Sequence, residues 1–555
     1  MPVSIVPPDR LVPLNDVASD PTRGIVLYWQ VMQRRTRYNW ALEHAIELAR
    51  EWRRPLVVLE ALRAGYPWAS DRLHRFALDG MRDNARGYAS AGVQHVRYVE
   101  PRPGDGRGLL LALAERACTV VTDEFPEFFI PRMLNAAGHK LARAGVRLEA
   151  VDGNGLLPLR AAGKAWVTAA HFRRMLQREL PDALAYAPAP NPLPRARSLP
   201  PVEGETASWL EGIRTRWPSP ADVLIGGDAR DAARALAALP IDHDVPPVDF
   251  RGGEQKARRV LRAFIDGKLD TYSARRNEAE DPSNSGLSPY LHWGFVSVHE
   301  VFAAVARHQA WTPLRLAPRA TGKREGWWGM TPDAEAFLDE LVTWREVSYN
   351  TAHWVPENDT YASLPAWARQ TLDAHRGDRR AEVFTRDQLE AGATYDALWN
   401  ATQGQLRTDG RIHNYLRILW GKKFLEWTET PEEALAHMLH LNNRWALDGR
   451  NPNSTGGITW VMGRYDHAWQ ERPVIGKVRA MSSAATAKKI RVDGYIERYA
   501  ATLPGHTAPR ADAGDGRGEA PAPRRERHTP RDRGPARGAG TSGLDVLPDD
   551  DDTRS

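Results

Sequence analysis

The chain contains almost no cysteine, since Cys118 is the only one among its 555 residues. A single thiol excludes an intramolecular disulfide and a zinc site built from several cysteines. Because free cysteines are usually buried, we expect Cys118 to lie in the core. The sequence also lacks an apolar run of about 18 residues, so no membrane-spanning helix is expected. These absences favour a cytoplasmic protein without a zinc–thiolate cluster.

Positive charge and tryptophan are the features that the sequence does have. The formal net charge is +5, which is compatible with a polyanionic partner. Most of the 20 tryptophans lie between Trp293 and Trp469. We therefore expect the chemistry of the protein in the second half of the chain.

Short apolar runs alternate with amphipathic helical stretches near the start of the chain. The expected strands cover residues 24–30, 55–62, 96–100, 118–124 and 146–152. This alternation predicts a doubly wound, mostly parallel sheet, whose ligands bind at the carboxyl ends of the strands. We assign residues 1–19 to an N-terminal extension and residues 20–180 to an α/β domain. The loop PGDGRG lacks a complete dinucleotide fingerprint and is interpreted as a plain turn.

The remainder of the chain is expected to be helical. Residues 181–245 begin with a proline-rich stretch that suits an exposed connector. Residues 246–500 show helical periodicity without a clear strand, which predicts an all-helical domain. Residues 501–555 are rich in Gly, Ala, Pro, Arg and Asp. Because this composition buries too little apolar surface to offset chain entropy, we expect a disordered tail.

Two motifs of the helical half are rich in small polar residues. In SNSGLSPYLHWG, Ser285 or Ser288 could cap a helix whose first turn contains Pro289, or the free N–H groups there could bind a phosphate. The stretch HLNNRWALDGRNPNSTGGITW carries several asparagines. Buried amides need hydrogen bonds, so this stretch is either a solvated loop or a site for a polar, planar ligand such as a flavin.

Three further motifs are aromatic. Glu340 and Trp344 share a helical face, where the carboxylate could meet a substrate or solvent. Trp420 and Trp427 in ILWGKKFLEW stand about 10.5 Å apart along a helix axis, a spacing that alone favours a packing seam. Basic and aromatic residues interleave in RYDHAWQERPVIGKVRAMS. This last stretch is either an ordinary charged surface or a nucleic-acid contact.

Together these motifs resemble those of class II cyclobutane pyrimidine dimer photolyases, in the photolyase/cryptochrome family. The segments LSPYLHWG, HNYLRILWGKKFLEW and NPNSTGGITW carry the resemblance, which covers about residues 20–500. It implies an α/β domain, often with an antenna chromophore whose identity the sequence leaves open, followed by a helical FAD-binding domain. It also implies a carbon–carbon lyase that repairs pyrimidine dimers in double-stranded DNA. In the family, photoexcited, reduced anionic FAD passes an electron to the flipped-out dimer.

The resemblance also assigns roles to individual residues. The implied flavin contacts are Tyr272, Ser285, Gly286, Leu287, Ser288, Arg345, Arg417, Asn442 and Asp448. Of these, Arg417 and Asp448 match an ion pair beside the flavin ring, and Asn442 matches an amide that faces flavin N5. The implied substrate and DNA contacts are Glu340, Trp344, Trp460, Trp469, Lys477 and Arg479. The implied electron relay runs from Trp420 through Trp399 to Trp427, which we expect to face solvent.

Two positions depart from the family pattern. Ile418 stands where a methionine often touches the dimer, and His467 stands where an arginine often braces DNA. Two other functions also stay open. A cryptochrome-like blue-light sensor could signal through the tail, and a (6-4) photoproduct photolyase would use pocket histidines, of which we find no convincing pair near Trp344. We expect the protein to act as a monomer without a metal ion, and to associate with the nucleoid if its source is bacterial.

Overall fold

A computed structural model describes residues 5–500 and residue 502 of the chain. Residues 1–4, 501 and 503–555 lie outside the described residues, and so does nearly all of the predicted tail. Within the described part, no helix combines the length and the apolar character needed to cross a membrane.

Six strands form one sheet in the order β1-β6-β5-β2-β3-β4. Five are parallel and lie where the apolar runs predicted them: β2 (Ile25–Gln30), β3 (Leu56–Leu62), β4 (Gln94–Val99), β5 (Ala117–Asp123) and β6 (Leu148–Val151). β1 (Leu11–Pro13) pairs antiparallel with β6 at the sheet edge, so part of the stretch assigned to an N-terminal extension joins the sheet. The predicted doubly wound α/β fold is confirmed.

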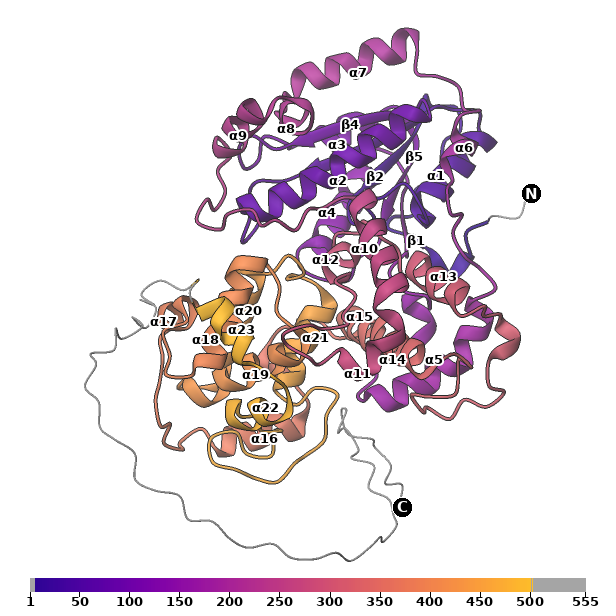
Figure 1. Cartoon of the computed structure of the whole chain (residues 1–555). Helices are drawn as coiled ribbons and strands as arrows, with labels where there is room; N and C mark the ends of the chain where they lie inside the picture. The colour runs from indigo at the N-terminus through magenta and orange to yellow at the C-terminus, as the bar shows by residue number, and fades with distance from the viewer. Residues whose placement is uncertain (1–4, 501, 503–555) are drawn as a thin grey trace, which may run out of the picture. The chain divides into compact units, whose positions relative to one another are not determined.

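Helices cover both faces of this sheet (Figure 1). They are α1 (Trp40–Glu51), α2 (Asp71–Ser90), α3 (Leu109–Ala114) and α4 (Ile130–Arg143). Alternate residues of β2 enter different cores: Val26 and Tyr28 pack with residues of α1, whereas Ile25 and Leu27 pack with residues of α3 and α4. Cys118 is buried in β5, as predicted. Two covered faces explain why the central strands β2 and β5 are buried at every position.

Short helices occupy the stretch between the sheet and the helical half. These are α5 (Ala169–Ala183), α6 (Leu193–Ala196), α7 (Gly204–Arg216), α8 (Ala221–Gly226) and α9 (Ala229–Ala237). Leu210 and Ile213 of α7 and the following Trp217 join the core that contains α3 and α4. The predicted connector is therefore partly packed against the α/β region.

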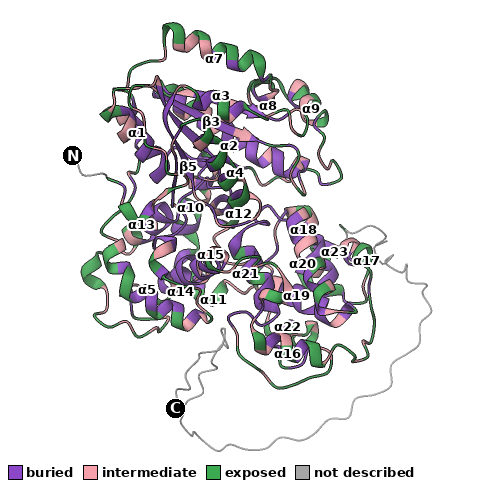
Figure 2. Cartoon of the chain, turned by 180° about the vertical axis from the view of Figure 1, so that it is seen from behind, coloured by how far each residue is buried: buried purple, intermediate pink, exposed green. Residues whose placement is uncertain are grey.

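The second half is helical, and between residues 254 and 500 the described chain forms no strand of the sheet. Its helices are α10 (Glu254–Gly267), α11 (Tyr272–Arg275), α12 (Ser288–His292), α13 (Val298–His308), α14 (Pro332–Leu338), α15 (Arg345–Trp354), α16 (Ala366–Ala374), α17 (Arg386–Ala391), α18 (Ala397–Asp409), α19 (Asn414–Trp427), α20 (Pro431–Trp445), α21 (Pro452–Val461), α22 (Ser483–Lys489) and α23 (Asp493–Ala500). Figure 2 shows that α18 to α21 carry much buried surface. A Cβ on Gly421 of α19 would stand 2.7 Å from the Val461 side chain, so α19 and α21 pack closely.

A buried arginine of the α/β region forms hydrogen bonds with the helical half. Arg72 of α2 donates to the carbonyls of Leu406, Arg407 and Trp445, which lie near the ends of α18 and α20. Carbonyls at a helix end have no partner within the helix and carry partial negative charge. The guanidinium therefore satisfies groups from two helices at once.

Candidate active site

An ion pair between α19 and the loop after α20 is the most polar feature of the helical half. Arg417 Nη2 and Asp448 Oδ1 lie 3.1 Å apart, and both side chains are largely buried. The Ser288 hydroxyl donates to the second oxygen of Asp448 at 2.6 Å. Burial alone raises the pKa of Asp448, but Arg417 and the Ser288 hydroxyl outweigh it and hold this pKa below its ordinary value. The pair is therefore charged at neutral pH.

Asn442 is buried beside this ion pair. Its Nδ2 donates to the Ser454 hydroxyl at 2.8 Å, and its Oδ1 accepts from Arg417 at 3.4 Å. Ser454, on α21, was not singled out from the sequence, although it lies within the asparagine-rich stretch. Side chains from α19, α20 and α21 thus form one hydrogen-bonded group.

The other asparagines of this stretch support the fold. Asn443 accepts from the backbone N–H of Arg450 at 2.8 Å. Asn451 caps α21 and donates to the Tyr349 hydroxyl at 3.1 Å. Asn453 is exposed. The stretch is therefore mostly buried, and much of its polarity is satisfied within the protein.

The loop before α12 carries the residues that the resemblance placed near flavin phosphates. Gly286 has a φ of +63°, a conformation that favours glycine. Ser285 Oγ accepts from the Leu287 N–H at 3.3 Å. No side chain caps α12, and the Ser288 hydroxyl is directed to Asp448 instead. A Cβ on Gly286 would stand 3.5 Å from Arg411 Nη1, so a guanidinium lies close to this loop.

Glu340 lies on a π-helical segment, Asp339–Trp344, between α14 and α15. Segments of this type are frequent at functional sites. Arg276 donates to Glu340 Oε1 at 2.9 Å, and its guanidinium lies 5.7 Å from the ring centre of Tyr272. Burial raises the pKa of Glu340, and Arg276 opposes that rise. Arg276 was not predicted as a site residue, and its position four residues after Tyr272 is the one local feature that marks it.

The indoles of Trp344 and Trp460 come from segments in close contact. The Ser348 hydroxyl donates to the Trp344 carbonyl at 3.0 Å, and a Cβ on Gly456 of α21 would collide with Ser348. Trp344 Nε1 is buried and has no hydrogen-bond partner among the described residues. Lys422 Nζ lies 5.3 Å from the ring centre of Trp460, within reach of a cation–π interaction. An unpaired indole N–H is thus available to a bound acceptor.

Arg345 contacts the α/β region instead of the ion pair. Its Nη1 donates to the Asn154 carbonyl at 2.5 Å, and its guanidinium lies 4.2 Å from the ring centre of Tyr349. Tyr349 in turn accepts from Asn451. Arg345 is thereby connected to α21 through two intermediate side chains.

Three indoles form a row in the helical core. Trp399, Trp420 and Trp427 are 0%, 1% and 2% exposed. Trp399 Nε1 donates to the Trp420 carbonyl at 2.9 Å, and the rings of Trp399 and Trp427 lie 5.3 Å apart. The prediction that Trp427 faces solvent is wrong, because the rings of Phe384 and Tyr395 lie against it.

Residues 463–479 form a loop that carries the predicted DNA contacts. The backbone N–H of Trp469 donates to the Lys477 carbonyl at 2.8 Å. His467 stacks on the Trp469 ring at 4.9 Å, and Arg479 lies 4.8 Å from the same ring. The structure therefore brings Trp469, Lys477 and Arg479 together in one loop.

A cavity of about 1010 Å³ lies at the carboxyl ends of β2 to β5. The Tyr66 and Tyr98 hydroxyls are buried at its wall without a hydrogen-bond partner among the described residues, and burial raises both pKa values to about 12. The PGDGRG loop is a turn that lines part of this wall, and the backbone N–H groups of Gly104 and Gly106 donate to Glu100. The other walls are largely apolar and include Trp29, Leu62, Phe125, Phe129 and Met133.

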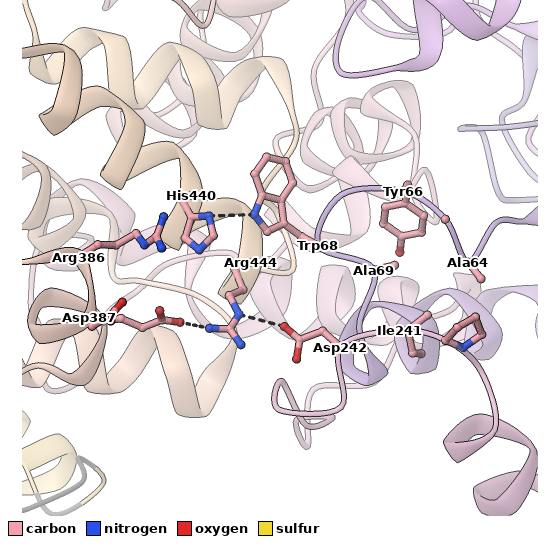
Figure 3. Close-up of a pocket in the computed structure, with 13 residues that line it drawn as sticks. Ala64, Tyr66, Trp68, Ala69, Ile241, Asp242, Arg386, Asp387, His440 and Arg444 are labelled. Atoms are coloured by element: carbon pink, nitrogen blue, oxygen red, sulfur yellow. Dashed lines mark hydrogen bonds and ion pairs between the residues drawn. The ribbon is translucent and has the colours of Figure 1, made fainter. Parts of the chain in front are cut away.

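A smaller pocket of about 530 Å³ lies where the loop after β3 meets α17 and α20 (Figure 3). Arg444 pairs there with Asp242 at 3.0 Å and also with Glu390. Trp68 Nε1 donates to His440 Nδ1 at 3.4 Å. None of the predicted site residues lines this pocket. Its contacts join the α/β loop to the helical half.

Comparisons with known proteins identify the family of the chain. A scan against protein-family models finds no match. A deoxyribodipyrimidine photo-lyase from Methanothermobacter thermautotrophicus is 32% identical over 491 residues, which cover 88% of this chain and 98% of the relative. The chain belongs to the deoxyribodipyrimidine photo-lyase family. Another family member, from Oryza sativa subsp. japonica, is 33% identical over 88% of this chain and 89% of its own length.

A solved structure shows that the fold also agrees with this family. It is a bacterial class III photolyase from Agrobacterium tumefaciens, with a TM-score of 0.59. The similarity covers 87% of this chain and 88% of the other, at 20% sequence identity. At that identity the similarity concerns the fold alone.

Proposed function

We propose that the protein repairs cyclobutane pyrimidine dimers in DNA by a light-driven reaction, with FAD as its cofactor. Membership of the deoxyribodipyrimidine photo-lyase family over almost the whole chain supports this function. The observation that carries it is the buried, charged pair of Arg417 and Asp448 with Asn442 hydrogen-bonded beside it. Glu340, Trp344 and Trp460, which the family resemblance assigns to the dimer pocket, favour a repair enzyme over a sensor.

The side chains around this ion pair fit a flavin. Arg417, Ser288 and Asn442 offer a guanidinium, a hydroxyl and an amide, which match the donors and acceptors along a flavin ring edge. The glycine at position 286 lets the backbone approach a phosphate, and Arg411 supplies a compensating positive charge. When bound, the reduced flavin supplies the light-driven electron transfer, while the protein binds and orients the reactants.

Glu340, Trp344 and Trp460 are proposed to hold the flipped-out dimer. The Glu340 carboxyl group is proposed to form a hydrogen bond with the carbonyl edge of the dimer; burial raises its pKa, and Arg276 opposes that rise. Arg276 fixes the position of this carboxyl group through its 2.9 Å contact. Lys422 Nζ lies 5.3 Å from the Trp460 ring centre, and burial lowers the pKa of this amine to about 7, so it carries only part of a positive charge near the pocket at neutral pH.

The loop at residues 463–479 is proposed to bind double-stranded DNA around the damaged site. Lys477 and Arg479 supply positive charge for phosphates, and Trp469 supplies a ring for stacking. Damaged pairs are weakly held, which lowers the free energy needed to flip the dimer out of the duplex. We propose that the protein does this as a monomer in the cytoplasm.

The large cavity at the sheet is proposed to hold the antenna chromophore. Its apolar walls suit a planar conjugated ring, and the unpaired hydroxyls of Tyr66 and Tyr98 suit polar groups on that ring. Arg63, Arg107 and Lys140 line the cavity as well, which favours an anionic chromophore. His292 and Trp293 form the part of the wall next to the helical half, so the two cofactors would lie in neighbouring regions.

Repair is tested by irradiating the reduced protein with DNA that contains pyrimidine dimers. Dimers are expected to disappear in blue light and persist in the dark. Glu340→Ala is expected to lower the repair yield severalfold while flavin content is retained, because the dimer loses a hydrogen-bond partner. Glu325→Ala, an exposed site on a nearby segment, is the matched control. Equal dimer levels in light and dark would refute the proposed function.

A further inference from the structure

The row of buried indoles ends at an exposed tyrosine. Tyr395 is 61% exposed, whereas Trp427 beside it is 2% exposed. Trp427 Nε1 donates to the Tyr395 hydroxyl at 3.0 Å, and their ring centres lie 5.5 Å apart. Phe384 also contacts Trp427, but it is buried and its benzene ring resists oxidation. Among these neighbours, Tyr395 alone combines an oxidisable ring with access to water.

We propose that Tyr395 is the terminal electron donor of the tryptophan relay, an inference that rests on the proposed light-driven function. One electron moves from Tyr395 to the oxidised indole of Trp427, which returns to its neutral form. The oxidised tyrosine releases its phenolic proton to water and becomes a neutral radical. A thiol in solution then donates a hydrogen atom, which restores tyrosine and leaves a thiyl radical.

The spacing of the rings supports this last transfer. The ring centres of Trp399 and Trp427 lie 5.3 Å apart, and those of Trp427 and Tyr395 lie 5.5 Å apart. The step to Tyr395 is therefore as short as the step before it. The hydrogen bond from Trp427 Nε1 to the Tyr395 hydroxyl also places the electron donor and the electron acceptor in direct contact.

The charges around Trp427 favour transfer outward. Lys423 Nζ lies 5.5 Å from the Trp427 ring centre, and this side chain is largely buried. Its positive charge opposes a second positive charge on the indole, although the Glu426 carboxylate, 2.8 Å from Nζ, offsets part of that effect. A tyrosine that has lost its proton carries no charge as a radical. Oxidation at Tyr395 therefore avoids the repulsion that oxidation at Trp427 meets.

Light-induced radicals identify the terminal donor. The full-length, FAD-loaded protein is illuminated without an added thiol, frozen, and examined by electron paramagnetic resonance. A tyrosyl signal is expected, and Tyr395→Phe is expected to abolish it. Tyr186→Phe removes another exposed tyrosine and should leave the signal unchanged. Tyr395→Trp should replace the tyrosyl signal with a tryptophanyl signal.

Two further measurements separate this proposal from the proposed function. Photoreduction of the oxidised cofactor should slow in Tyr395→Phe and recover in Tyr395→Trp. Dimer repair by chemically reduced Tyr395→Phe should equal that of the unaltered protein, because the relay is not needed once the cofactor is reduced. A tyrosyl signal that survives in Tyr395→Phe, or its absence from the unaltered protein, would overturn the role of Tyr395 while leaving repair intact.

Discussion

The interior around α19 and the loop at residues 463–479 use similar side chains in opposite surroundings. Trp399 is wholly buried in the interior, whereas Trp469 is only partly buried in the loop. Burial raises the pKa of Glu127, which contacts α21, to about 7, whereas a hydrogen bond from His375 lowers the pKa of Glu471 in the loop. The contrast shows that burial and neighbours, more than residue type, decide how each side chain acts.

The largest expected difference concerns the two tryptophans. Trp399→Ala should lower the free energy of unfolding by about 3–5 kcal/mol, because it leaves a cavity in a close-packed core. Trp469→Ala should change it by less than about 1 kcal/mol, because its surroundings are open. Urea unfolding in the dark measures both values. Trp399→Phe, which keeps a ring, is the control, and similar losses for the two alanine variants would break the comparison.

The second expected difference concerns how the free energy of unfolding changes with pH. The pKa of Glu127 is raised by burial from 4.5 to about 7, and the hydrogen bonds from Thr455 and Asn358 only partly oppose that rise. As pH increases through this window, the unfolded chain releases the proton before the folded protein does, so Glu127 lowers stability progressively until about pH 7. Glu127→Gln imitates the protonated carboxyl group. It should be more stable than the unaltered protein by on the order of 3 kcal/mol at about pH 8.

Unfolding curves measured across the pH range test this expectation. The two proteins should have similar stability at about pH 4, where the carboxyl group is protonated in both folded and unfolded chains. The Glu471→Gln variant is a suitable comparison, since the pKa of Glu471 in the unaltered protein is lowered, whereas that of Glu127 is raised. A constant difference between Glu127→Gln and the unaltered protein at every pH would contradict the assigned titration.

The smallest expected effect concerns DNA binding by the loop. Arg479→Gln removes a positive charge that lies 4.8 Å from the Trp469 ring and is proposed to contact a DNA phosphate. Affinity for dimer-containing DNA should fall by about two- to fivefold, measured by fluorescence anisotropy at fixed salt. Arg102→Gln, at a highly exposed arginine of the α/β region, should leave affinity unchanged. Equal losses in both variants would indicate a general charge effect instead of a loop contact.

Much of the fold could be predicted from local patterns. The runs that became β2 and β5 contain consecutive apolar residues, and every residue of both strands is buried because both faces are covered. β1 could not be predicted in this way, since its three residues show no periodicity and it forms against the open edge of β6. The π-helical segment at Asp339–Trp344 likewise leaves no local signal, because an extra residue in a helical turn depends on packing around it.

The candidate site was harder to predict than the fold. Arg417 and Asp448 are 31 residues apart, and only the family resemblance linked them before the structure placed them 3.1 Å from each other. Arg276 and Ser454 had no such link and were missed. Tyr395 lies 32 residues before Trp427 in a turn-like stretch, so nothing local marked it as a partner of that indole. These pairs form through contacts between segments that are distant in the sequence, so residue spacing along the chain does not predict them.

Loops after each of β2, β3, β4 and β5 form part of the wall of the large cavity, together with residues of α3, α4 and α12. Loops accept changes of sequence and length more readily than the strands that hold them. Altering these loops would change the occupant of the cavity without disturbing α19, α20 or α21. With the proposed antenna chromophore in this cavity, an engineer could change the wavelengths of light that are absorbed separately from the proposed repair reaction.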